Sequence, residues 1–177
     1  ALRDVAFTIA DLAALRELAA TLQQPRKIHL KIDTGMNRQG ILPGEIAQAL
    51  QEISQNKNLI LEGVCSHLAD ADNPDQSFTD RQVESWNTVA AIFAKIEPPI
   101  RYFHLVATKG FALSPRVKAN VARIGAGIYG INPSGHYRLA LRPALEVRSV
   151  IAAVKSVAIG EKIGYNATFE APRPMRI

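Results

Sequence analysis

Several side chains that carry charge or hydrogen-bonding groups lie at the ends of short apolar segments in this sequence of 177 residues. The first, HLKIDTGMNRQG at residues 29–40, alternates like a β-strand, which places Lys31 on the same side as His29 and Asp33. A lysine on a covered strand face needs a partner or a covalent modification. Arg38 follows a turn, and a guanidinium beside a strand end can bind a phenolate, carboxylate or phosphate. We therefore expect a functional site here.

Polar residues also end the later strand-like segments. His67 closes GVCSH, Thr108 follows YFHLVA, and Arg123 precedes the glycines of RIGAGIYG. An arginine inside a buried sheet is unfavourable unless it is paired, so Arg123 is the most informative of these residues. Gly125 would let a backbone N–H approach an anion, although a glycine can also simply mark a bend. The histidine and the aspartates that follow it lack the geometry that commits a metal, so no metal site is expected.

Alternating helices and strands have to position these residues. Apolar spacing predicts helices at residues 10–22, 43–55, 75–96 and 110–114, strands at 27–33, 59–67 and 102–107, and a strand followed by a loop in VARIGAGIYG. This alternation is typical of a parallel α/β fold, either an open doubly wound sheet or a barrel. Because the polar residues follow successive strands, we favour a (β/α) barrel, whose chemistry lies at the carboxyl ends of its strands.

The pattern changes after Pro133. The segment that begins with LRPALEVRSVI has short β-branched runs, glycines at turns and no helical period, which indicates antiparallel β structure. The stretch NPSGHYR is typical of a linker. We therefore expect one domain over residues 1–134 and the beginning of a β-rich domain over residues 135–177.

Composition narrows the class of protein. The net charge is +5, but the basic residues are scattered and no recognition motif accompanies them, so nucleic-acid binding is not expected. No apolar run is long enough to cross a membrane. Cys65 is the only cysteine, which excludes an internal disulfide and makes a reducing, cytoplasmic location the default expectation.

Six motifs together resemble those of alanine racemases, and they occur in the order found in that family. They are HLKIDTGMNRQG, GVCSHLADAD, YFHLVATKG, VARIGAGIYGINPSG, LRPALEVRSVI and GEKIGYNATFEAPRPMRI. The resemblance implies a pyridoxal 5'-phosphate (PLP) enzyme of fold type III that interconverts L-alanine and D-alanine for peptidoglycan. It also implies a homodimer, each subunit with a (β/α)8 TIM barrel and a C-terminal β domain, whose active sites are shared between the subunits.

The resemblance assigns roles to individual residues. Lys31 matches a lysine that is often carbamylated and would hold Arg38. Arg38 would bind the PLP phenolic oxygen and help to place the substrate carboxylate. His67 and His104 match histidines of the hydrogen-bond network around the cofactor.

The remaining matches concern the phosphate, the pyridine ring and the second base. Thr108 and the amide of Gly125 match phosphate-binding positions, although Ala-Thr-Lys replaces the more usual Asn-Ser pair. Arg123 matches the arginine that faces the pyridine nitrogen. Tyr165 matches the catalytic tyrosine, which acts across the dimer interface on one face of Cα while the Schiff-base lysine serves the other.

The family motif around the Schiff-base lysine, of the type Val-Lys-Ala-Asn-Ala-Tyr-Gly, does not occur in the sequence. Lys118 in RVKANVARIG only echoes it, and we do not assign this lysine to PLP. We expect an internal segment: part of the barrel and the first strands of the β domain, inactive alone. Two alternatives are a serine/alanine racemase domain of a membrane-bound protein and a non-catalytic PLP-binding barrel. The β-rich tail with Tyr165 argues against the second.

Overall fold

The computed structural model describes residues 5–177, which fall into two compact units, one up to residue 144 and the other from 145 to 177. The first unit is built on five parallel strands in sequential order, β1-β2-β3-β4-β5. The strands are β1 (Phe7–Ile9), β2 (Arg26–Lys31), β3 (Leu59–Cys65), β4 (Tyr102–Ala107) and β5 (Val121–Arg123). The helices are α1 (Leu12–Thr21), α2 (Ile46–Ser54) and α3 (Ser77–Phe93), with short 3-10 segments η1 (Pro43–Glu45), η2 (Phe111–Arg116) and η3 (Ala126–Tyr129).

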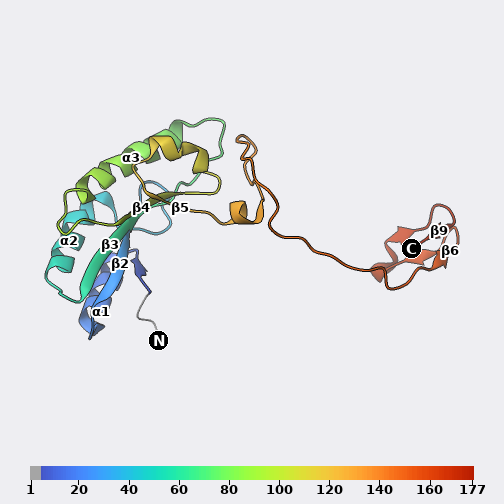
Figure 1. Cartoon of the computed structure of the whole chain (residues 1–177), viewed down its shortest axis with the longest axis horizontal. Coiled ribbons are helices and arrows are strands. Elements are labelled where there is room, and N and C mark those ends of the chain that lie inside the picture. Colours follow the sequence, from blue (N-terminus) through green and yellow to red (C-terminus); the bar gives the residue numbers. More distant parts are fainter. Residues whose placement is uncertain (1–4) are drawn as a thin grey trace. The chain divides into compact units, whose positions relative to one another are not determined.

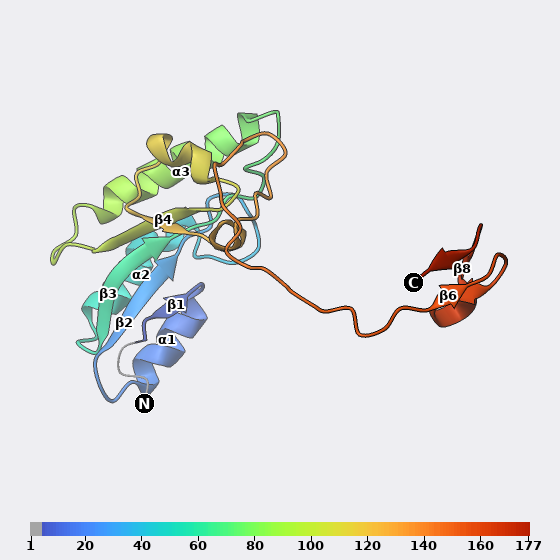
Figure 2. The same ribbon diagram turned by 45° about the vertical axis from the view of Figure 1, so that its right-hand side comes forward.

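The strand order decides between the two parallel folds that the sequence left open. In a doubly wound sheet the order reverses at a switch point and helices cover both faces. Here the order is sequential, and α1, α2 and α3 lie on the same side of the curved sheet (Figure 1, Figure 2). This is the arrangement of a partial (β/α)8 barrel, and the predicted fold class is confirmed.

The hydrophobic core lies between the sheet and these helices. Ile28, Leu30 and Ile32 have no exposed surface, and they share one buried cluster with Trp86 and Phe93 of α3. Burying a side chain of this size stabilises the fold by about 1.5–3 kcal/mol. The alternation predicted for strand β2 is confirmed, because the side chains between these buried residues lie on the opposite face of the sheet.

Several predicted boundaries differ from the structure. The expected helix at residues 43–55 begins with the 3-10 turn η1, and the expected helix at 75–96 extends only over α3. Strand β1 is absent from the sequence-based prediction, because it has three residues and is followed almost at once by the helix cap Asp11. The Asp11 carboxylate accepts a hydrogen bond from the Ala14 amide at 2.7 Å.

The second unit contains two short antiparallel pairs, which agree with the expected antiparallel β structure. Strand β6 (Ser156–Val157) pairs with β9 (Met175–Arg176), and β7 (Lys162–Ile163) pairs with β8 (Phe169–Glu170) around the 3-10 turn η4 (Tyr165–Ala167). The prediction is wrong for residues 141–155, which form no helix or strand although they begin with LRPALEVRSVI. β-Branched residues favour extended backbone, but a ladder also requires a partner strand, and none of the described residues supplies one.

A tight loop returns the chain to the end of β2. The Ile41 amide donates to the Lys31 carbonyl at 2.8 Å, and the Asp33 amide donates to the Ile41 carbonyl at 3.0 Å. The Asp33 carboxylate accepts from the amides of Gly35 at 2.8 Å and Asn37 at 3.1 Å, so it holds the loop rather than continuing the strand. The loop thereby fixes the position of the residues between Asp33 and Ile41.

The Gly40→Ala substitution should lower the free energy of unfolding of the complete protein by about 2–4 kcal/mol. Gly40 has a φ of +141°, and a Cβ there would overlap the backbone of Ile32 and Asp33. The matched control is Gly44→Ala, since no atom lies within 4 Å of a Cβ at that position. Urea denaturation should show the loss for Gly40 and a change within about 0.5 kcal/mol for Gly44. Equal effects of the two substitutions would contradict this description of the loop.

Candidate active site

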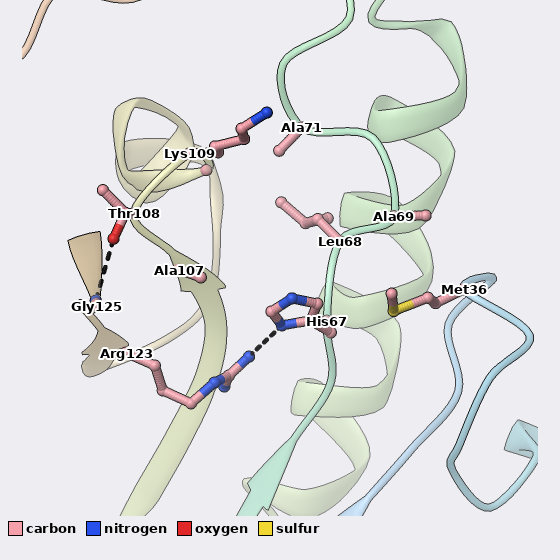
Figure 3. A pocket seen from close by; sticks show the side chains of 11 residues that line it. Met36, His67, Leu68, Ala69, Ala71, Ala107, Thr108, Lys109, Arg123 and Gly125 are labelled. Atoms are coloured by element: carbon pink, nitrogen blue, oxygen red, sulfur yellow. Dashed lines mark hydrogen bonds between the residues drawn. The ribbon is translucent and has the colours of Figure 1, made fainter. Parts of the chain in front are cut away.

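The Arg123 guanidinium, at the end of β5, joins the carboxyl ends of three strands. Its Nη1 donates to His104 Nδ1 at 2.6 Å and to the His104 carbonyl at 3.0 Å. Its Nη2 donates to the carbonyls of Ser66 at 2.7 Å and Leu105 at 2.9 Å, and to His67 Nδ1 at 2.9 Å. Figure 3 shows the Arg123 and His67 side chains pointing toward one another. The sequence-based expectation that Arg123 must be paired is confirmed, and it was the sheet that supplied the partners.

Both histidines beside Arg123 are held in the neutral form. Burial, and after it the charge of Arg123, lowers the pKa of His104 to about 4. Burial and then the charges of Arg123, Arg38 and Lys31 also lower the pKa of His67. Arginine has only donors and stays charged in proteins, although burial lowers its own pKa. The Nδ1 atoms of His67 and His104 are therefore acceptors.

The backbone around His67 is fixed by α3. Gln82 on this helix is buried, its Oε1 accepts from the Ala69 amide at 2.8 Å, and its Nε2 donates to the His67 carbonyl at 3.4 Å. The hydroxyls of Thr34 and Ser66 lie 2.8 Å apart and join the two loops that follow β2 and β3. These contacts hold His67 in place.

A cavity of about 380 Å³ opens at the same strand ends and is lined by residues from four segments. Its lining includes Met36, His67, Leu68, Thr108, Lys109, Arg123 and Gly125. Thr108 is buried, and its hydroxyl oxygen accepts from the Gly125 amide at 3.1 Å (Figure 3). The structure thus brings together four of the predicted site residues, namely His67, Thr108, Arg123 and Gly125. His104 joins them through Arg123.

A Schiff-base lysine would have to reach this cavity, and Lys118 and Lys109 differ in this respect. Lys118 precedes β5, at the opposite end of that strand from Arg123, and its backbone is tied to α3 through Trp86 and Asn87. It lines a separate hollow beside α3, which agrees with its exclusion from the site. Lys109 does line the cavity, and its Nζ lies 3.7 Å from Asp72.

Asp72 also ties the segment that leaves the barrel to the loop after His67. Its carboxylate accepts from the Ser134 hydroxyl, and from the Gly135 amide at 3.1 Å. These two hydrogen bonds hold the pKa of Asp72 below its usual value. Asp72 is thus used by the protein itself, and the described residues contain no group of three or more acidic, histidine or cysteine side chains arranged to hold a metal.

Lys31 and Arg38 lie near the site, and no hydrogen bond joins these two described residues in the structure. Lys31 Nζ donates to the Gln39 side chain at 3.1 Å, and Arg38 is exposed. Their charges nevertheless act on His67. Tyr165 belongs to the second unit, where its side chain is 98% exposed.

Two residues of this network were missed in the sequence. His29 on β2 and Glu62 on β3 extend the polar contacts from His104 along the sheet face opposite the helices. The signal was present for His29, which alternates with the buried Ile28 and Leu30. Glu62 gave a weaker signal, because its neighbours on β2 depend on the strand register. That register shifts at a bulge between Ile28 and His29 and cannot be read from the sequence.

Comparisons with known proteins agree with this fold. The family described as "Alanine racemase, N-terminal domain" matches residues 1–133. The alanine racemase of Pediococcus pentosaceus is 35% identical over 95% of this chain, and that of Methanococcus maripaludis is 31% identical over 98%. The chain spans 46% and 48% of these two relatives, which is about half of their length.

Solved structures show the same similarity. The alanine racemase from E. faecalis has a TM-score of 0.75 and 31% identity, covering 99% of this chain and 49% of that one. The alanine racemase from Streptomyces lavendulae has a TM-score of 0.82 and 26% identity, covering 98% and 48%. A histidine racemase from Leuconostoc mesenteroides has a TM-score of 0.79 and 27% identity, covering 98% and 48%.

The fold and site therefore define a barrel of the amino-acid racemase type. The chain belongs to the alanine racemase family, and the predicted resemblance is confirmed. Among the described residues, no helix has the length and apolar character needed to span a bilayer.

The low pKa of His104 predicts a loss of stability in acid. The folded-state pKa of about 4 lies below the unfolded value of 6.5, so the contribution is complete above pH 6.5 and is lost as the pH falls toward 4. Between pH 7.5 and pH 5 this histidine should account for about 2 kcal/mol of lost unfolding free energy. Urea denaturation of the complete protein and of its His104→Gln variant, at both pH values, would measure it. The variant should lose less stability than the wild type, and identical losses would contradict the assignment.

Proposed function

We propose that the protein to which this chain belongs uses PLP to interconvert L-alanine and D-alanine by a two-base mechanism. The observation that carries the proposal is the cluster at the strand ends, where Arg123, His67 and Thr108 line one cavity. The family membership of the chain supports the same reaction. PLP would supply an electron sink for the electrons released at Cα.

The residues at one side of the cavity fit the phosphate of PLP. Gly125 contributes a backbone N–H and Thr108 a hydroxyl, which already lie 3.1 Å apart. The Thr108 hydroxyl can donate to a phosphate oxygen while still accepting from the Gly125 amide, and this amide would donate to the phosphate itself only by giving up its hydrogen bond to Thr108. The Lys109 side chain adds positive charge at the cavity rim.

Arg123 fits the pyridine nitrogen. Its guanidinium is held by main-chain carbonyls and two neutral histidines, and no carboxylate among residues 5–177 hydrogen-bonds it. Arginine would donate a hydrogen bond to the ring nitrogen rather than transfer a proton to it. The ring would then withdraw electrons less strongly than a protonated one, which favours simple proton exchange over more extensive reactions.

Lys31 and Arg38 would act on the phenolic oxygen and the substrate carboxylate. We propose that Lys31 is carbamylated in the complete protein, which would convert its side chain to an anion and draw Arg38 toward it. The loop between Asp33 and Ile41, which carries Arg38, is anchored at both ends by backbone hydrogen bonds. A move of the exposed Arg38 side chain therefore requires no change in the strand.

Tyr165 would hold or accept the Cα proton at its Oη on one face of the substrate. Its exposure within residues 145–177 supports an action in the active site of the other subunit of a homodimer. A lysine elsewhere in the complete protein would serve the opposite face. Two bases on opposite faces let each enantiomer lose its proton on one side and gain it on the other.

Membership of the family supports a proposal for the location and the metabolic role of the enzyme. We propose a cytoplasmic enzyme that supplies D-alanine for peptidoglycan, with the barrel part ending near residue 134 and the β domain beginning at 135. The family match, which ends at residue 133, supports this boundary, while the compact units meet at residues 144 and 145.

Most of the similar proteins are named alanine racemases, which supports alanine as the substrate. The neighbour from Leuconostoc mesenteroides is titled a histidine racemase, so the choice of amino acid needs its own assay. Racemisation of alanine, serine and histidine by the complete protein should be compared at equal enzyme concentration. We expect kcat/KM to be highest for alanine, and a higher value for serine or histidine would reassign the substrate.

The Tyr165→Phe substitution tests the two-base mechanism in the complete protein. The variant loses the hydroxyl that handles the Cα proton on one face, so removal of that proton should slow by about 10²–10⁴-fold. Exchange of the Cα hydrogen with deuterated water, started from each pure enantiomer and followed by NMR, separates the two directions. One enantiomer should be affected far more strongly than the other. Slight and equal effects on both would contradict the assigned role.

A further inference from the structure

A chain of polar contacts leads from Arg123 along the sheet face away from the cavity. His104 Nε2 lies 2.9 Å from His29 Nδ1, and His29 Nε2 lies 3.6 Å from the Glu62 carboxylate. Glu62 is also paired with Lys27 at 2.7 Å. The side chains of His29 and Glu62 are only 17% and 13% exposed, so water screens these contacts weakly.

Gly63 makes this chain of contacts possible. His29 is on β2 and His104 is on β4, so the strand β3 lies between them. Gly63 is the β3 residue opposite His29, and a Cβ there would lie 2.7 Å from the imidazole ring. With no side chain at this point, the His29 ring crosses β3 and reaches His104.

The hydrogen atoms along the chain are determined by its two ends. Arg123 can only donate, so His104 Nδ1 accepts and the hydrogen of this neutral ring is on Nε2. His104 Nε2 then donates to His29 Nδ1, which leaves the His29 hydrogen on Nε2, facing Glu62. At 3.6 Å the carboxylate is beyond hydrogen-bond distance, so it acts on this N–H mainly through its charge.

We propose that Glu62 is a positioning residue for Arg123, acting through His29 and His104, an inference that rests on the proposed role of Arg123 beside the cofactor. The negative charge of Glu62 favours the His29 tautomer with its hydrogen on Nε2. That tautomer keeps His104 Nδ1 free to accept from Arg123. Lys27 is paired with Glu62, and this pairing is the main reason that the pKa of Glu62 is lowered, so the carboxylate stays charged at neutral pH.

The opposite arrangement of hydrogens would disturb Arg123. A hydrogen on His29 Nδ1 would force His104 Nε2 to accept, and the hydrogen of His104 would then lie on Nδ1. Two donors would face each other across the 2.6 Å that now separates Arg123 Nη1 from His104 Nδ1. Arg123 would have to leave this position, and with it the orientation that we assign toward the pyridine nitrogen.

Neutron diffraction from deuterium-exchanged crystals of the complete, cofactor-free protein tests the proposal without any variant. We expect deuterium on Nε2 and none on Nδ1 in both His29 and His104. Deuterium on Nδ1 of either ring would overturn the proposal. The measurement is independent of catalysis, so a protein with these tautomers but without racemase activity would refute the proposed function and leave only the assigned hydrogen positions standing.

A charge swap provides a second test. The double variant Lys27→Glu/Glu62→Lys keeps an ion pair between β2 and β3 but places a cation beside His29 Nε2. We expect deuterium to move to Nδ1 of His29 and His104, and kcat/KM for racemisation to fall at least about tenfold. The control Lys27→Met removes the cation but keeps Glu62, so deuterium should stay on Nε2 in both rings. Unchanged deuterium positions in the folded double variant would overturn the role of Glu62.

Discussion

The Arg123 guanidinium is the interaction on which the candidate site depends. Parallel strands end at the same edge of a sheet, where main-chain carbonyls of neighbouring strands lose their ladder partners. Arg123 donates to three main-chain carbonyls near this edge, of Ser66, His104 and Leu105, and to two imidazoles, and the His104 carbonyl also accepts from the Ser66 amide. A planar fork with several donors can meet all of these acceptors at once, whereas an ammonium group cannot. Burial, and after it the charge of Arg123, holds both histidines neutral, and the contacts with Arg123 make the Nδ1 atom of each one an acceptor.

The two faces of the sheet have different roles. The face toward α1, α2 and α3 holds the apolar core and provides the rigidity, with Ile28 and Leu30 fully buried. The opposite face carries His29, Glu62 and His104, which would be unfavourable at such low exposure without mutual contacts. Gly63 joins the two halves of this network by leaving room for an imidazole to pass over β3. Stability and function thus rest on alternate residues of the same strands.

Much of this arrangement could be predicted from the sequence, because its signals are local. Alternating apolar residues identified β2, β3 and β4, and the cost of an unpaired arginine in a sheet singled out Arg123. The partners of Arg123 could not be predicted, since they depend on which carbonyls and imidazoles the strand register brings together. Glu62 was hidden for the same reason, by a bulge between β2 and β3. The β-branched run near Val147 led to a wrong prediction of β structure, because a preference for extended backbone does not form a strand without a partner.

Arg123 organises the strand ends, in addition to the role that we propose for it beside the cofactor. The Arg123→Lys substitution keeps the charge but removes the fork, and unfolding of the complete, cofactor-free protein measures what the fork contributes. We expect the free energy of unfolding to fall by about 2–3 kcal/mol, since buried carbonyls and His104 Nδ1 would lose their donor. A variant as stable as the wild type to within about 0.5 kcal/mol, with only its affinity for PLP reduced, would contradict this central claim.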